Sequence, residues 1–168
     1  MQLIECRLEI DDIDSFVADL GDFGDRHGVT IQAFDARYVA GRRHLERAVE
    51  FADRAIDRGE NVARDRAVEI LLYAAGRRQI DRALAMGVDD GETRAVVLVD
   101  GDSDEDEVAA LEAVETLAAF VDREPTLETQ DVETLCDFFD VPDAEREATD
   151  APLSALVRER VALLEVEK

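Results

Sequence analysis

Residues 67–76 read Ala-Val-Glu-Ile-Leu-Leu-Tyr-Ala-Ala-Gly. The apolar side chains of residues 67–75 continue around nearly the whole circumference of a helix, as they must in a helix that is covered on all sides. Asn61 or Asp65 can open this helix, and Gly76 interrupts it. The stretch therefore predicts a central helix around which the other elements pack.

Helical spacing of apolar side chains continues on both sides of this stretch. Residues 42–58 carry such side chains on one face, and Gly59 follows where a left-handed C-cap is expected. Residues 77–86 resume the spacing, so the glycine break places Arg77 and Arg78 at a helix start. Further helices are predicted over residues 104–121, over residues 132–139 and after Pro152.

Strand patterns occur at the start and in the middle of the chain. Residues 3–10 alternate apolar and charged side chains, which is the period of a half-buried strand. Residues 29–35 and 94–99 are predicted as two further strands, the latter from its β-branched run. Residues 163–167 are compatible with a strand or with the end of the last helix, and the sequence leaves both open.

A short helix is predicted between the first two strands, from Asp12 or Asp14 to Leu20, and the chain is expected to break after it at Gly21, Gly24 and Gly28. The sequence contains no internal repeat and no Pro- or Ser-rich linker. Together these patterns predict an α+β fold, with one domain over residues 1–168 and a small mixed or antiparallel sheet covered by helices.

The composition is strongly acidic. The chain of 168 residues carries 42 Asp and Glu against 19 Lys and Arg, a net charge of -23, yet 46% of its residues are apolar and follow helix and strand spacing. All basic residues except Lys168 are arginines, a composition typical of proteins from extreme halophiles that work in molar salt. No apolar run approaches the roughly 20 residues that span a bilayer, so we expect a cytoplasmic protein without membrane contact.

Charge is distributed unevenly along the sequence. Residues 37–82 contain 11 Arg and 8 Asp or Glu, a local net charge of +3 in an otherwise acidic chain. A basic segment of this kind is a candidate anion site. The alternative is that its arginines form ion pairs with acids one turn away on the helix over residues 42–58.

Motifs for catalysis and for metal binding are not found in the sequence. His27 and His44 have no ligand partner at i+3 or i+4, and Cys6 and Cys136 form no paired motif. Residues 100–107 lack the turn glycine of a calcium loop, so an acidic helix start is the better interpretation. Signatures of a serine nucleophile, a P-loop and a dinucleotide site are missing as well. We therefore expect no catalytic residue, no cofactor and no metal.

Three stretches together resemble a known family. They are Gln-Ala-Phe-Asp-Ala-Arg-Tyr-Val-Ala-Gly at 32–41, His-Leu-Glu-Arg-Ala at 44–48 and Glu-Ile-Leu-Leu-Tyr-Ala-Ala-Gly-Arg-Arg-Gln-Ile-Asp-Arg-Ala at 69–83. They resemble the TPRKB-like family, the KEOPS subunit that binds the kinase-like ATPase of that complex. The ending from Arg160 to Val166 is also similar, whereas residues 101–149 match only in pattern.

The resemblance implies a non-catalytic member of the assembly that makes threonylcarbamoyl adenosine (t6A) beside the anticodon of tRNA. It further implies that this subunit docks on the small lobe of the kinase-like ATPase, captures the single-stranded 3′ CCA end of tRNA, and meets the other KEOPS subunits indirectly. Two observations on the residues agree with it: no catalytic motif was found, and the basic segment contains the family's signature.

An unpaired RNA end is held by cationic side chains on its phosphates and by flat or apolar surfaces under its bases. The predicted RNA-binding residues are Asn61, Arg64, Arg77, Arg78 and Gln79. The alternative is that Gln79 caps its helix locally while Arg77 and Arg78 pair with Glu69 or Asp81. Because counterion release gives little driving force in molar salt, we expect a shallow salt dependence of RNA binding.

The C-terminus offers an apolar surface for the ATPase partner in a chain that is otherwise charged. The predicted partner-binding residues are Val157, Val161, Leu163, Leu164 and Val166. The same spacing fits simple closure of the core, and both interpretations stay open. Two other functions also remain: a structural adaptor of the complex without RNA contact, and a small phosphate-handling enzyme that holds its substrate with Arg77 and Arg78.

Overall fold

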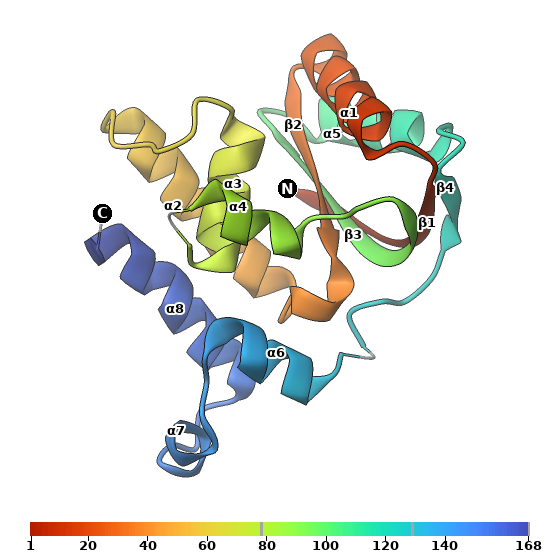
Figure 1. Cartoon of the computed structure of the whole chain (residues 1–168). Helices are drawn as coiled ribbons and strands as arrows, with labels where there is room; N and C mark the ends of the chain where they lie inside the picture. Colours follow the sequence, from red (N-terminus) through yellow and green to blue (C-terminus); the bar gives the residue numbers. More distant parts are fainter. Residues whose placement is uncertain (78, 129, 168) are drawn as a thin grey trace. The chain divides into compact units, whose positions relative to one another are not determined.

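A four-stranded antiparallel sheet with the strand order β2-β3-β1-β4, accompanied by helices, forms the architecture (Figure 1). The structure is a computed structural model that describes residues 1–77, 79–128 and 130–167. It confirms the α+β class predicted from the sequence, and the sheet is antiparallel rather than mixed. Among the described residues, no helix is both long enough and apolar enough to span a bilayer.

Contacts divide the chain into two compact units, each built from two separate segments. The sheet unit comprises Met1–Ala36 and Gly87–Glu128, and the helical unit comprises Arg37–Met86 and Thr129–Lys168. The chain therefore passes from one unit to the other three times. The single domain over residues 1–168 stays a prediction.

The longest strands of the sheet unit are β1 (Gln2–Ile10) and β3 (Gly91–Gly101), which pair over nine residues. β2 (Val29–Asp35) pairs with the other side of β3, and the short β4 (Phe120–Arg123) pairs with the other side of β1. The three strands predicted from the sequence are confirmed. The alternation of apolar and charged residues is the pattern of a half-buried strand, and β-branched residues are enriched in strands.

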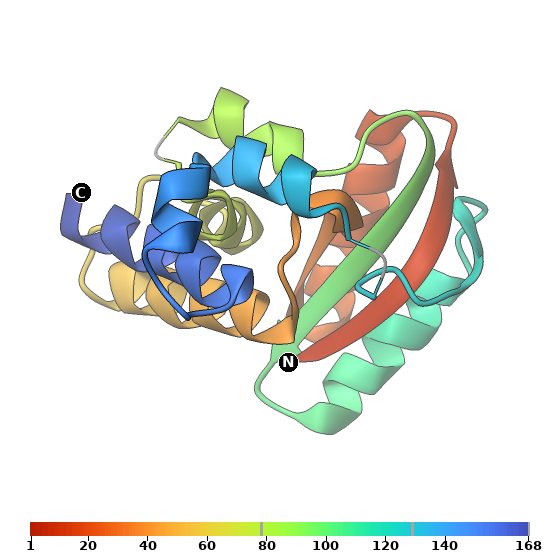
Figure 2. The same cartoon turned by 90° about the horizontal axis from the view of Figure 1, so that it is seen from below.

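Two helices, α1 (Ile13–His27) and α5 (Asp104–Glu115), cover one face of this sheet (Figures 1 and 2). Burial of apolar area between sheet and helices stabilises the unit by about 25 cal/mol per Å². The core there consists of Ile4, Cys6, Leu8, Ile10, Phe16, Leu20, Ile31, Ala33, Ala95, Val97, Val99, Ala110, Leu111 and Val114.

The first helix differs from the prediction, which placed chain breaks at Gly21 and Gly24. Both glycines lie inside α1, which ends at His27 with Gly28 in the left-handed conformation at φ 66°. Gly24 permits a close approach, because a Cβ at this position would lie 2.8 Å from the carbonyl oxygen of Val29. At Gly24 the prediction was wrong because a glycine used for close packing looks, in the sequence, like one that ends a helix.

The helix predicted over residues 104–121 starts as expected and ends early. Ser103 caps it by accepting a hydrogen bond from the backbone amide of Asp106 at 3.2 Å, and four acidic residues fill the first turn, where the helix dipole favours them. This confirms the acidic helix start. Beyond Glu115 the prediction was wrong, because the chain turns and residues 120–123 form β4 instead.

The helical unit is organised around α3 (Arg66–Ala75), the predicted central helix, which Figure 2 shows nearly end-on. Every residue from Glu69 to Ala75 is buried. Asp65 caps the start of α3, and Gly76 ends it in the left-handed conformation at φ 64°. The predicted central helix is confirmed. It packs against α2 (Arg42–Asp57) and α8 (Leu153–Glu167), which also pack against each other.

Three shorter helices complete this unit: α4 (Ile80–Ala83), α6 (Val132–Phe139) and α7 (Asp143–Glu147). α6 has the predicted bounds, and α7 occupies a stretch where no helix was expected. The prediction of one helix over residues 77–86 was wrong in extent, because α4 has four residues and continues only as a 3-10 turn. Residues 163–167 belong to α8, so they are helical and not a strand.

Candidate functional site

The helical unit carries most of the basic residues. It contains 15 Lys and Arg against 19 Asp and Glu, a net charge of -4, whereas the sheet unit contains 4 against 23, a net charge of -19. The basic segment over residues 37–82 lies within the helical unit. An anionic ligand is therefore repelled far less by this unit than by the other.

The loop before α3 is held by a buried acid, Glu69. Its carboxylate is fully buried, and one oxygen accepts hydrogen bonds from the backbone amides of Val62 and Ala63, both at 3.1 Å. Asn61 donates through its side-chain amide to the carbonyl oxygen of Ala63 at 2.8 Å. Asn61 is therefore half-buried and engaged within the loop, whereas Arg64 is exposed to solvent.

Arg77 is held by the end of α6. Its Nη2 donates to the carbonyl oxygen of Phe138 at 2.6 Å and lies 3.6 Å from the carboxylate of Asp140, and a quarter of its side chain stays exposed. Among the described residues these are the polar partners of its guanidinium group, so the alternative pairing of Arg77 with Glu69 or Asp81 was wrong. The carbonyl group of Phe138 is free to accept because the last turn of a helix leaves its carbonyl groups without partners inside the helix.

Arg160 on α8 binds the same helix end. Its Nε donates to the carbonyl oxygen of Phe139 at 3.2 Å, and its Nη2 donates to that of Asp140 at 3.1 Å. Its Nη1 also binds the carboxylate of Glu145 on α7 at 2.9 Å, and this bond lowers the pKa of Glu145. Two arginines that lie far apart in the sequence thus fix the junction between α6 and α7.

Two aromatic rings lie between arginines in the helical unit. The ring centroids of Tyr38 and Phe138 are 4.7 Å apart. The guanidinium carbon of Arg37 lies 5.2 Å from the centroid of the Tyr38 ring. The guanidinium carbon of Arg77 lies 5.5 Å from the centroid of the Phe138 ring. Both rings are partly exposed. We call Arg37, Tyr38, Phe138 and Arg77 the aromatic–arginine cluster; it combines positive charge with flat surfaces.

Sequence reasoning missed this cluster. Tyr38 stands in one of the stretches that carry the family resemblance, but Phe138 lies about a hundred residues later in a region that matches only in pattern. The scarcity of aromatic residues was the available signal, since they make up 5% of the chain. An aromatic residue next to a basic one in an acidic, aromatic-poor chain is a candidate for surface recognition.

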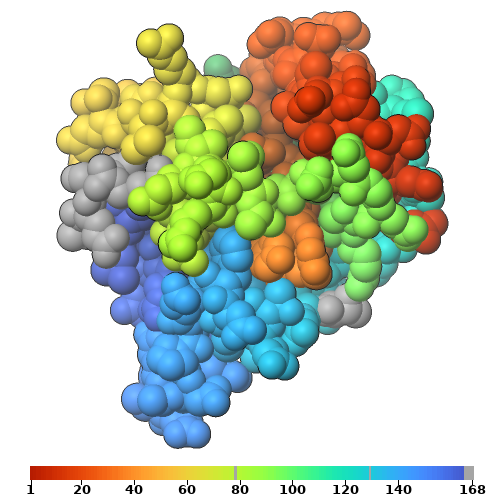
Figure 3. Space-filling view, in the orientation of Figure 1, coloured from red at the N-terminus to blue at the C-terminus, as the bar shows by residue number. Residues whose placement is uncertain are grey.

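Gln79 and the residues after it form an exposed surface. Gln79 is the N-cap residue of α4 but makes no side-chain capping bond, so the expected local cap is not observed. Ile80 is 41% exposed and Leu84 is 57% exposed, four residues apart. In Figure 3 residues 79–86 (green) and the loop before α3 (yellow) lie on the face shown. The fifth predicted RNA-binding residue, Arg78, lies outside the described residues.

The predicted partner-binding residues separate into two groups. Val157, Val161 and Leu164 are almost completely buried, so they close the core of the helical unit, which was the alternative interpretation. Leu163 is 43% exposed and remains available to a partner. The side chain of Val166 lies outside the described residues. Their positions along one helix did not reveal which side α2 and α3 would cover.

His44 has a structural position in the helical unit. It is buried, its Nδ1 lies 3.0 Å from the backbone amide of Ala40, and its Nε2 lies 2.7 Å from the carbonyl oxygen of Ala74. Because the amide donates, Nδ1 accepts and Nε2 carries the proton. Burial lowers the pKa of His44 to about 4. Over the described residues, no group of three or more His, Cys, Asp or Glu side chains could hold a metal ion.

The fold and the site define an α+β protein whose candidate site is a binding surface, made of arginines, aromatic rings and exposed aliphatic side chains. The family model of the kinase binding protein CGI-121 matches residues 22–165, and the chain belongs to this family. It is a family of kinase-binding proteins and not a known enzyme family. No match was found among curated proteins.

Proposed function

We propose that this protein is the non-catalytic KEOPS subunit that docks on the kinase-like ATPase and recruits tRNA through its 3′ CCA end, in support of t6A formation. Membership of the kinase-binding family supports the docking on a kinase-like partner. The resemblance of the three sequence stretches to the KEOPS subunit supports membership of that assembly and binding of tRNA.

The observation that carries RNA binding is the aromatic–arginine cluster. Unpaired nucleotides stack on aromatic rings and on guanidinium planes, and their phosphates need cationic donors. Tyr38 and Phe138 supply the rings, and Arg37 and Arg77 supply both charge and planar groups. The cluster belongs to the unit with little net negative charge, which is where a polyanion can approach.

Further donors come from the predicted residues that remain exposed. Arg64 extends from the loop that Glu69 anchors, and Gln79 precedes α4 without a side-chain cap. An anchored loop presents its arginine at a smaller entropic cost than a mobile one. Asn61 contributes indirectly, since its amide is engaged with Ala63 and stabilises the loop.

The decisive experiment compares binding of tRNA with and without its terminal CCA, in molar KCl. We expect the Arg37→Glu, Arg64→Glu double variant to lose about tenfold or more in affinity for intact tRNA, since single stacking or charge contacts contribute about 1–3 kcal/mol. Arg146→Glu on α7 makes the same kind of charge change at another exposed arginine of this unit and serves as the control.

Three results of this experiment are informative. A loss for the double variant but not for the control, seen only with tRNA that carries CCA, agrees with the proposal. Equal binding by the folded double variant and the parent contradicts the RNA site. No binding of any tRNA by the parent favours the alternative of a structural adaptor, for which the engagement of Arg77 by α6 is the supporting observation.

The partner surface is assigned to three of the exposed aliphatic residues of the helical unit: Ile80, Leu84 and Leu163. Exposed aliphatic side chains in a strongly charged surface mark candidate contacts with another protein. We expect the Ile80→Asp, Leu84→Asp double variant to lose co-purification with the kinase-like subunit. Val17→Asp changes an aliphatic residue of the sheet unit that is about as exposed as Leu84, and this variant should still co-purify with the kinase-like subunit. Retention by the folded double variant contradicts this surface.

A further inference from the structure

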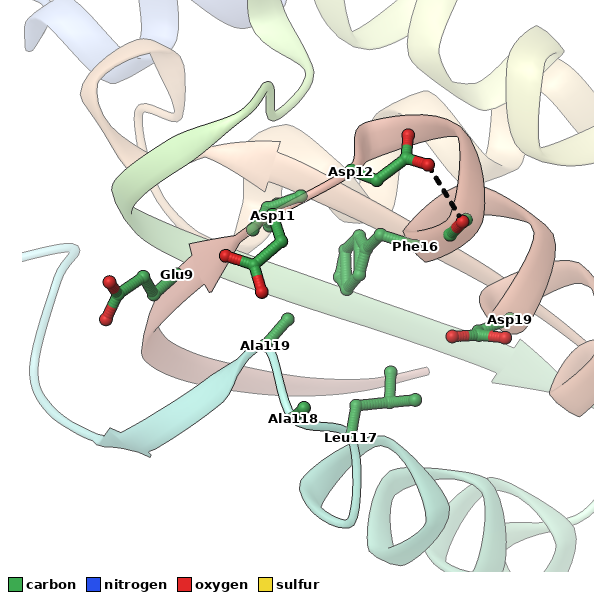
Figure 4. A pocket seen from close by; sticks show the side chains of 10 residues that line it. Glu9, Asp11, Asp12, Phe16, Asp19, Leu117, Ala118 and Ala119 are labelled. Carbon is green, nitrogen blue, oxygen red and sulfur yellow. Dashed lines mark hydrogen bonds between the residues drawn. The ribbon is translucent and has the colours of Figure 1, made fainter.

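The sheet unit contains a cavity of about 300 Å³ that the proposed function does not use. It lies where the end of β1 meets the start of α1 and the turn after α5 (Figure 4). Its inner surface is apolar, with the ring of Phe16 facing Leu117 and Ala119 across the cavity in Figure 4. Its volume is at the lower end for ligand sites, about 300–1,000 Å³, so an occupant is small.

The backbone around this cavity is well fixed. The amide of Glu9 donates to the carbonyl oxygen of Ala119 at 2.8 Å and joins β1 to the turn after α5. Asp12 caps α1, since its carboxylate accepts from the amide of Asp14 at 3.1 Å and from the hydroxyl of Ser15 at 3.0 Å. A cavity lined in this way is preformed, so filling it costs little ordering of the chain.

Acidic side chains surround the apolar interior. Asp11 and Asp19 flank Phe16 on its two sides in Figure 4, and Glu9 lies farther out. None of these three side chains forms a hydrogen bond or an ion pair with a described residue, and all three are exposed. Their mutual repulsion is relieved by a cation, whereas an anion is excluded.

The arginines of the sheet unit do not supply this cation. None of its four basic residues lines the cavity. Three of them form ion pairs elsewhere: Arg7 with Glu92 at 3.7 Å and Asp122 at 3.8 Å, Arg94 with Glu124, and Arg123 with Glu115. The fourth, Arg26, lies over the ring of Phe23. The cavity is thus an apolar space with uncompensated negative charge at its edge.

From this geometry we propose that the cavity binds an aliphatic cation, with an alkyl stem on Phe16 and Leu117 and an ammonium or guanidinium head at Asp11 and Asp19. A bare metal ion would leave the apolar surface unfilled, and within the described residues no group of three ligating side chains is available to hold one. The head comes either from a free polyamine or from an Arg or Lys side chain of a polypeptide. Both present the same chemistry.

The test is titration of the full chain, uniformly labelled with nitrogen-15, with butylguanidinium chloride, followed by amide chemical shifts. We expect saturable shifts confined to residues 9–19 and 117–119, with a dissociation constant in about the millimolar range. Guanidinium chloride, which lacks the stem, and butyrate, which carries the opposite charge, should not produce them. Failure of butylguanidinium to saturate these amides would overturn the proposal.

Variants then distinguish binding at the cavity from a general attraction of the cation to an acidic surface. Asp11→Asn and Asp19→Asn should each weaken binding about two- to fivefold, the range for one exposed charge contact. Asp25→Asn lies on α1 outside the cavity and should leave affinity unchanged. An equal loss for Asp25→Asn contradicts a local site, and so does unchanged binding of both cavity variants while they remain folded.

The source of the cation is decided by two further titrations, one with spermidine and one with an acetylated and amidated Gly-Arg-Gly peptide. Tighter binding of the peptide assigns the cavity to a side chain of a partner protein, and tighter binding of spermidine assigns it to a free amine. If neither shifts the cavity amides, the proposal is contradicted. Because the cavity lies in the sheet unit, none of these outcomes depends on the RNA or the kinase-like partner.

Discussion

The guanidinium group of Arg77 donates a hydrogen bond of 2.6 Å to the carbonyl oxygen of Phe138, 61 residues later in the chain. This bond joins the segment after the central helix to the last turn of α6. It gives an arginine in a stretch that resembles the family's signature a structural role beside any role in binding. Substitutions at Arg77 must therefore be judged on stability before they are judged on ligand affinity.

For Arg77→Ala we predict a loss of about 1.5–3 kcal/mol in the free energy of unfolding, the usual range for a hydrogen bond to a charged group. The measurement is denaturant unfolding followed by circular dichroism. Arg82→Ala removes an exposed arginine of α4 and should cost much less. Equal stability of Arg77→Ala and the parent would show that the contact with Phe138 contributes nothing.

We expect Glu69→Gln to loosen the loop before α3. The amide side chain keeps one acceptor oxygen but replaces a charged acceptor that now binds the amides of Val62 and Ala63, so about 1–3 kcal/mol should be lost. Hydrogen exchange of these two amides reports the change directly, and it should accelerate relative to the parent. Glu60→Gln, at an exposed position in the same loop, is the control.

The stability of the protein should depend on the protonation of His44. Its pKa is about 4 in the folded chain, against 6.5 as the ordinary value, so the unfolded state binds more protons between these two pH values. The contribution of His44 is therefore complete above about pH 6.5 and decreases as the pH falls toward 4, by up to about 3 kcal/mol.

The corresponding experiment compares unfolding of the parent with that of His44→Gln across this pH range. The difference in unfolding free energy between the two should shrink as the pH falls, because the variant has no imidazole to protonate. Carboxylates contribute to both curves and cancel in the difference. A constant difference between pH 7 and pH 4 would contradict the assignment.

Thiol reactivity should distinguish the two cysteines. Burial raises the pKa of Cys6 to about 12, so its thiolate is almost unpopulated at neutral pH, and the side chain is inaccessible in the core of the sheet unit. Cys136 is partly exposed on α6. Iodoacetamide at neutral pH should modify Cys136 and spare Cys6 until the chain is unfolded, as mass spectrometry of proteolytic peptides will show. Rapid modification of Cys6 in the folded chain would contradict this.

Much of the fold followed from local patterns in the sequence. The run of apolar residues that ends at Gly76 predicted a central helix because only a helix covered on all sides needs no polar face. The alternation from residue 3 to residue 10 predicted β1 for the equivalent reason. Predictions failed where one residue type serves two purposes, as Gly24 does, or where helical spacing continues into a strand, as it does at Val121 in β4.

The candidate site was less accessible to sequence reasoning. The basic segment indicated a candidate anion site in the helical unit, but no local pattern reveals that Arg77 binds a backbone carbonyl of α6. Nor could it distinguish buried Val161 from exposed Leu163, two residues apart on the same helix. Such distinctions depend on which helices pack together, and that is decided by contacts distant in sequence.

The alternation of the chain between its two units has a practical consequence for dissecting the molecule. Because each unit is assembled from an early and a late segment, no single stretch of the sequence contains either one whole. Truncation of the chain at a single point therefore leaves a unit with only part of its core. Isolating the helical unit requires joining residues 37–86 to residues 129–168 through a designed connection, and isolating the sheet unit requires the same for residues 1–36 and 87–128.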